Sequence, residues 1–214
     1  ALLAFRRPPA PGPDSRGSVT RAHPAALAAL AALTLAAYAA PIVATGEPTF
    51  AGYVSLDDTA TWLAIGDGRL EEGDETGRVP PSSYEATLSY TVERGSYPAG
   101  AMLPFAAGAR VVGTDAAWAF QPYIAILAAL LALLAELLLR GAIPRTPLRL
   151  GAAFVAAQPA LLYAFGFWSG IKEITAAVLV AAVVASVAHL AGPPRPRALL
   201  PAALVAAALL SALS

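Results

Sequence analysis

Five long apolar runs constrain what this chain can fold into more than any other feature of its sequence. Each is close to the ~20 residues that a helix needs to cross a hydrocarbon layer of ~30 Å. Because lipid offers the backbone no hydrogen-bond partners, each run is predicted to be a helix. We therefore expect an all-α fold, a polytopic membrane helical bundle. The predicted spans are residues 24–44, 116–140, 150–168, 171–191 and 198–214.

Composition excludes the usual soluble alternatives. The mean hydropathy is +0.63, and 57% of the residues are hydrophobic. Only 13% are charged, about half of the ~25% typical of a soluble domain, so one aqueous core could not bury this much apolar surface. The chain has no Cys, which excludes a disulfide framework and a thiol nucleophile. His23 and His189 are far apart in the sequence, which argues against a histidine-based metal cluster.

The sequence also makes predictions about the two ends of the chain. Residues 1–23 are rich in Pro and Arg and are predicted to form a disordered basic tail. A cleaved signal peptide is the rival interpretation of residues 24–44, although the run is long for one. The chain opens with Ala rather than Met and stops inside an apolar run, so we expect a fragment of a longer protein.

The placement of arginines predicts the orientation. Nine of the fourteen cations fall on one side if the spans alternate, and the positive-inside rule makes that side the cytoplasm. We therefore expect a multi-pass protein of the inner (cytoplasmic) membrane, with its N-terminus in the cytoplasm and loop 45–98 outside. This loop holds ten of the fourteen acids, and its charge would repel nucleic acid. The nine cations are Arg6, Arg7, Arg16, Arg21, Arg140, Arg145, Arg149, Arg195 and Arg197.

Two short juxtamembrane helices are predicted within this extracytoplasmic loop. The first starts at Ser55 with Asp58 in capping-box register, carries an apolar face, and is expected to stop at the glycines that begin with Gly66. The second starts at Ser82, with Glu85 in the same register, and runs to Arg94. Residues 99–113 are apolar but fewer than a membrane-spanning helix usually needs. We therefore expect a juxtamembrane or re-entrant segment on the outer side, with a short span as the alternative.

This order of elements resembles the N-terminal half of the GT-C glycosyltransferases, the family of protein mannosyltransferases, aminoarabinose transferases and arabinosyltransferases. The resemblance covers roughly residues 24–140. Asp57-Asp58 stand where the family carries an acidic residue or pair after its first span. Tyr97-Pro98 and Val111-Val112-Gly113 resemble the family's proline-led short helix that ends in an aliphatic-glycine pair. Tyr97-Pro98-Ala99 replaces the usual His-Pro-Pro or Lys-Pro-Pro turn.

The resemblance implies a membrane enzyme that transfers a sugar from a polyprenyl-phosphate donor at the outer face, with membrane lipid as its surroundings. It implies that Asp58, or alternatively Asp57, is the catalytic base or a ligand of a divalent metal ion. A carboxylate suits the chemistry, because the acceptor hydroxyl must lose a proton as the phosphate leaves. The structural alternative is that acids in a first helical turn stabilise the helix dipole and cap.

The donor phosphate needs cationic or hydrogen-bonding partners, and four residues are candidates for substrate binding. Lys172, the only lysine, lies beside Glu173 at the outer mouth of a span and is suited to hold the lipid phosphate. Its structural alternative is snorkelling to the interface. Arg94 could do the same work or simply stabilise a helix C-terminus, and Tyr97 belongs to the turn described above.

Polar groups inside the spans leave other functions open. Glu136 precedes Arg140 by four residues, which predicts a structural ion pair, and Gln158-Pro159 predicts a kink. A transporter or flippase-like protein would need ionisable groups deep in the spans or inverted repeats. A non-catalytic membrane scaffold is the third possibility.

Overall fold

The structure is a computed structural model and describes residues 22–46, 61–63, 65–66, 70, 82–83, 86, 98–159, 170–188 and 196–213. Of these residues, 84% are helical and none forms a strand. The predicted all-α fold class is confirmed. The predicted tail over residues 1–23 lies outside the described residues, apart from its last two positions.

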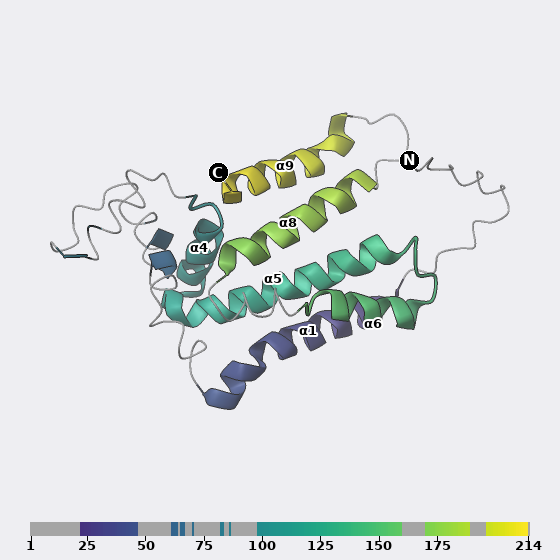
Figure 1. The fold of residues 1–214 in the computed structure, drawn as a ribbon, viewed down its shortest axis with the longest axis horizontal. Helices are drawn as coiled ribbons and strands as arrows, with labels where there is room; N and C mark the ends of the chain where they lie inside the picture. The colour runs from purple at the N-terminus through teal and green to yellow at the C-terminus, as the bar shows by residue number, and fades with distance from the viewer. Residues whose placement is uncertain are drawn as a thin grey trace, which may run out of the picture.

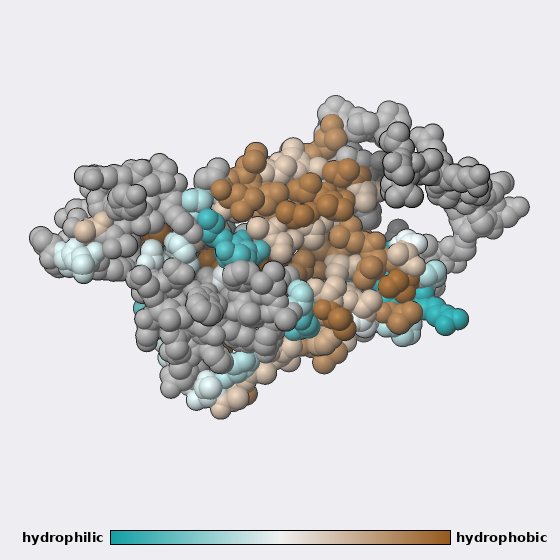
Figure 2. Space-filling view, in the orientation of Figure 1, coloured by the Kyte–Doolittle hydropathy of each residue, from teal (hydrophilic) through white to brown (hydrophobic). Residues whose placement is uncertain are grey.

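Among the described residues, three helices are long and apolar enough to cross a membrane: α1 (Pro24–Thr45), α5 (Ala116–Leu139) and α8 (Ile171–Ala188). The helix α5 is central, because both α1 and α8 contact it (Figure 1). The helix α9 (Pro196–Leu213) contacts α8, and its apolar part, Leu199–Leu213, is shorter than the three candidate spans. Apolar residues gather over the middle of the bundle in Figure 2, as expected for a surface that faces hydrocarbon. The chain therefore has the features of a membrane protein.

The ends of the long helices follow from local sequence signals. Pro24 opens α1 after His23, whose Nδ1 accepts a hydrogen bond from the Ala25 amide at 3.3 Å, and proline suits this first position because its missing N–H would be unpaired there. The same helix ends at Gly46, where φ is 73°, a left-handed conformation that glycine adopts without steric cost. Asp115 caps α5 by accepting from the Ala117 amide at 2.8 Å.

The bundle has two chemically different ends. The helices α1 and α9 run opposite to α5 and α8 (Figure 1). One end, which we call the basic end, holds the start of α9 and the turn after α5, with Arg140, Arg145, Arg149 and Arg197. The opposite end, which we call the α4 end, holds the starts of α5 and α8 and the short helix α4 (Met102–Val112).

The helix α4 covers residues for which a juxtamembrane or re-entrant segment is predicted. Its 11 residues reach about 16 Å, roughly half of a hydrocarbon core. Phe105 packs on Phe120 of α5 with ring centroids 5.7 Å apart and an interplanar angle of 89°, the edge-to-face arrangement that aromatic pairs favour. The length and the packing favour a helix seated against the start of α5.

The third predicted span, residues 150–168, differs from the observed helix. The helix α6 (Thr146–Ala156) begins earlier and ends well before the middle of that range. Ala157, Gln158 and Pro159 are not helical, and residues 160–169 lie outside the description. The physical reason for the early end is Pro159, which has no N–H to donate and disfavours helical geometry at the residue before it.

Tyr38 ties three helices together inside the bundle. Its side chain is fully buried, and its hydroxyl donates to the carbonyl of Ala157 at the end of α6, at 2.9 Å. Gln121 of α5, also buried, donates from Nε2 to the Tyr38 carbonyl at 3.4 Å. The carbonyl at the buried end of α6 thus has a hydrogen-bond partner in α1, as backbone at membrane depth requires.

Candidate functional site at the α4 end of the bundle

The sequence-predicted site residues are only partly covered by the structure. Asp57, Asp58, Arg94 and Tyr97 lie outside the described residues. Lys172 and Glu173 are described and occupy the first turn of α8, at the α4 end. The structure therefore bears on the residues that follow the acidic pair, from Thr61 on, and on Lys172 and Glu173.

The residues that follow Asp57-Asp58 are docked on the bundle. Thr61, Ile65 and Gly66 are helical and buried. A Cβ added to Gly66 would lie 3.1 Å from the Cβ of Ala106 in α4, so the absence of a side chain permits this close approach. Gly66 is a packing position within a helical turn, and Gly68 and Gly73, where the predicted stop continues, lie outside the described residues. Further along, Arg110 of α4 donates from Nη1 to the Leu70 carbonyl at 3.4 Å.

The second predicted loop helix is described only at its start. Ser82 is not helical, Ser83 and Ala86 are, and the Ala86 amide donates to the Ser82 carbonyl at 3.1 Å. This is the first intrahelical bond expected when Ser82 is the N-cap. The partner that the predicted capping box requires, Glu85, lies outside the described residues.

Lys172 lies where a cation does not help the helix. It is the second residue of α8 and is half-buried, while Glu173 is exposed. A positive charge in a first turn opposes the helix dipole, whereas a negative charge favours it. Lys172 shares a helix face with Thr175 and Leu179, at i+3 and i+7. The sequence indicated a role for Lys172 in substrate binding but gave no indication of which side chains surround the start of α8.

A cavity of about 460 Å³ opens among α4, α5, α8 and α9, and Thr175, three residues after Lys172, lines it. Its walls are apolar, apart from the hydroxyls of Tyr123, Thr175 and Ser211. The Thr175 hydroxyl is buried and lies beside the Tyr123 phenol. At the cavity edge, Gly100 touches α9 so closely that a Cβ there would collide with the Ser211 carbonyl.

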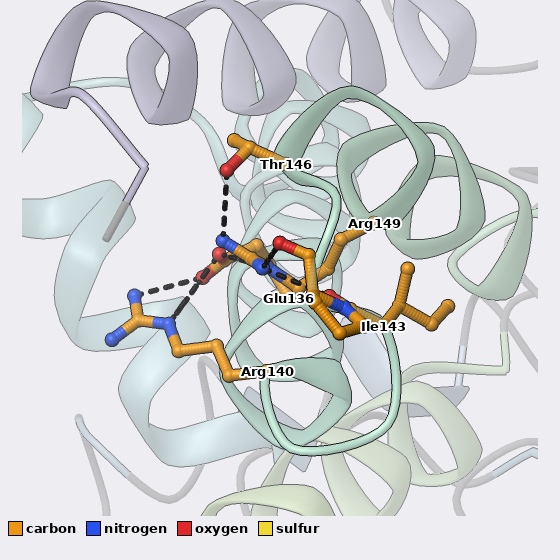
Figure 3. A network of polar contacts seen from close by, with 6 residues as sticks. Glu136, Arg140, Ile143, Thr146 and Arg149 are labelled. Atoms are coloured by element: carbon orange, nitrogen blue, oxygen red, sulfur yellow. Dashed lines mark hydrogen bonds and ion pairs between the residues drawn. The ribbon is translucent and has the colours of Figure 1, made fainter. Parts of the chain in front are cut away.

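A second polar cluster lies at the basic end, and the sequence predicted only one of its two ion pairs. The expected Glu136–Arg140 pair is confirmed, with Arg140 Nη2 2.8 Å from Glu136 Oε2. Arg149, expected only as a loop cation, is fully buried and donates from Nε to Glu136 Oε1 at 2.9 Å. Figure 3 shows both guanidinium groups converging on this one carboxylate.

The remaining donors of Arg149 are also used. Its Nη1 donates to the carbonyls of Ile143 and Pro144 at 2.9 and 3.3 Å, and its Nη2 to the Thr146 hydroxyl at 3.4 Å (Figure 3). A buried guanidinium paired in this way joins α5, the turn and α6. The cluster is therefore a structural clamp. No sequence pattern pointed to it, because the pair spans 13 positions and only the turn brings its members together.

A metal centre finds no support in the part of the chain that the structure describes, where no three His, Asp or Glu side chains come together. Asp57 and Asp58, the residues proposed for a metal ion, are outside that part. In comparisons with known proteins, no protein family, no curated protein and no solved structure matches this chain.

Proposed function

We propose that this chain is part of a membrane glycosyltransferase of the GT-C type. It transfers a sugar from a polyprenyl-phosphate donor to an acceptor at the outer face of the cytoplasmic membrane, and its N-terminus lies in the cytoplasm. Asp58 is the proposed base, with Asp57 as its alternative, and Lys172 is proposed to hold the donor phosphate.

One observation carries this proposal: the segment that follows the acidic pair and the first turn of α8 belong to the same end of the bundle. Thr61 is buried against the bundle, only three positions after Asp58. Gly66 of the same segment lies against Ala106 and Met102 of α4. Lys172 lies at this end too.

The proposed chemistry assigns one role to each charge. As the acceptor oxygen bonds to the anomeric carbon, Asp58 takes the hydroxyl proton and the bond from that carbon to the phosphate oxygen breaks. The electron pair leaves with the polyprenyl phosphate, and Lys172 stabilises the added negative charge. Because phosphate is already a good leaving group, no protonated acid is needed.

The test uses the full-length protein in membranes, with Asp57→Asn and Asp58→Asn tested singly for sugar transfer from a polyprenyl-phosphate sugar. Removal of a general base is expected to lower the rate by about 10²–10⁴-fold. Glu71→Gln, an acid of the same loop, is the matched control and is expected to retain activity. Wild-type transfer rates in both Asp variants would refute the proposal.

The alternative function, a transporter or flippase-like protein, is favoured by the break after α6. The helix α6 ends at Ala156, residues 157–159 are not helical, and the Gln158 Nε2 is buried without a hydrogen-bond partner. Interrupted helices with available polar groups form substrate sites in many transporters. Gln158→Leu separates the two functions, because it should abolish transport by such a protein and leave sugar transfer measurable in a transferase.

A further inference from the structure

We propose that the cavity among α4, α5, α8 and α9 binds one hydrocarbon chain of an anionic membrane lipid, with the lipid's phosphate on Lys172. This proposal concerns lipid binding alone and stands whether or not the chain transfers sugar. If the proposed function is correct, the sugar donor is one lipid that can occupy this site.

The size and walls of the cavity suit a lipid chain. Its volume of about 460 Å³ is within the range of ~300–1,000 Å³ found for small-molecule sites. Leu127, Val178 and Leu179 supply apolar walls from α5 and α8, and Ala208 borders the cavity from α9. Both α5 and α8 are membrane-spanning by length and composition, so a chain can enter from the surrounding bilayer.

The polar groups of the cavity gather at one of its ends. Thr175 is the fifth residue of α8, and Ser211 is two residues from the end of α9, so both lie toward the α4 end. The Thr175 hydroxyl lies beside the Tyr123 phenol, and both groups line the cavity. An ester or phosphoester oxygen of a lipid is an acceptor for these hydroxyls, and such a hydrogen bond stabilises the bound lipid.

The ammonium group of Lys172 belongs to the same face of α8 as Thr175, nearer to the start of the helix. Lys172 precedes Thr175 by three residues, which is about 4.5 Å along the helix axis. Apolar walls, then a hydroxyl, then a cation reproduce the order of chain, linkage and phosphate in an anionic lipid. The flexible lysine stem can follow the apolar surface and keep its ammonium group at the phosphate level.

The experiment is native mass spectrometry of the full-length protein in detergent, titrated separately with a long-chain polyprenyl phosphate, phosphatidylglycerol and phosphatidylcholine. The wild type is expected to bind at least one anionic lipid more tightly than phosphatidylcholine. Binding of phosphatidylglycerol alone identifies the occupant as a lipid of the bilayer, whereas binding of the polyprenyl phosphate identifies a carrier lipid. Either outcome supports the site.

Three variants locate the bound lipid. Ala208→Phe obstructs the cavity and should weaken binding by about tenfold or more, whereas Ala207→Phe, at the neighbouring position outside the cavity lining, should not. Thr175→Val removes only the hydroxyl and should weaken binding about fivefold, the net value of one hydrogen bond. Lys172→Gln should weaken the binding of anionic lipids about fivefold and leave the binding of phosphatidylcholine unchanged. Arg197→Gln at the basic end is the control and should not change the affinity for either kind of lipid.

Two results would overturn the proposal: equal affinity of the wild type for all three lipids, or equal effects of Ala208→Phe and Ala207→Phe. The lipid-binding result can be separated from the result of the sugar-transfer assay. Asp58→Asn is expected to abolish transfer and leave lipid binding intact. A protein that transfers no sugar but shows the pattern above retains the lipid site and loses the transferase assignment.

Discussion

Glu136 and Arg149 form an ion pair of 2.9 Å in which both side chains are sealed from solvent, although they lie on different helices. Arg140 reaches the same carboxylate from the partly exposed side. Two cations around one acid leave the cluster with a net positive charge. The pair fixes the start of α6 against the end of α5, and the stability of this hairpin therefore depends on it.

Removing one member of this pair should destabilise the protein strongly. Glu136→Gln leaves Arg149 buried without its acid, which costs about 3–5 kcal/mol. Arg149→Met leaves the buried Glu136 with Arg140 alone and should cost somewhat less. The midpoint of thermal unfolding in detergent, followed by circular dichroism, is expected to fall clearly in both variants. The double variant Glu136→Leu with Arg149→Met should recover part of the loss, because apolar side chains replace a buried pair well.

Arg140→Gln is the matched comparison for that experiment. The Arg140 side chain is 28% exposed, and partly exposed pairs contribute at most about 1 kcal/mol. Its unfolding midpoint should stay near that of the wild type. A loss as large as that of Arg149→Met would show that burial of Arg149 is not what makes its pair important.

Tyr38→Phe tests the link between α1 and the end of α6. The change removes only the hydroxyl that donates to the Ala157 carbonyl. Interhelical hydrogen bonds in membranes are worth about 0.6 kcal/mol on average and up to ~1.7, so a modest fall in the unfolding midpoint is expected. Thr45→Val, which loses a bond within α1 near its exposed end, should change the midpoint less.

Orientation is directly testable because the chain has no native Cys. A single Cys at Arg145 should react with a membrane-impermeant thiol reagent only after the cells are opened, since the basic end is predicted to be cytoplasmic. A single Cys at Ser83 should react in intact cells. The reverse pattern would invert the topology and remove the proposed site from the outer face.

Periodicity and length were enough to predict the three long helices, because apolar runs near 20 residues in lipid have one backbone solution. The capping signal at Ser82 and the pair of Glu136 with Arg140 were also predictable, since both are local in the chain. Burial of Arg149 was not, because it depends on how the turn after α5 folds back. The cavity among α4, α5, α8 and α9 was not predictable either, since its walls come from four separate helices.

Gly66 offers a test of the proposed function that leaves the proposed catalytic residues untouched. A leucine at this position would meet Ala106 and Met102 of α4 at once, because even a Cβ comes within 3.1 Å of Ala106. Gly66→Leu should therefore displace the segment that tethers Asp57-Asp58, and sugar transfer should fall about as far as in Asp58→Asn. The unfolding midpoint of the bundle should change little, because Tyr38, Phe120 and the α5–α6 clamp are unaffected. Gly108→Leu on α4, where an added Cβ meets nothing within 4 Å, is the control and should retain transfer. Full activity in Gly66→Leu would show that docking of this segment is not needed, and it would remove the observation on which the glycosyltransferase proposal depends.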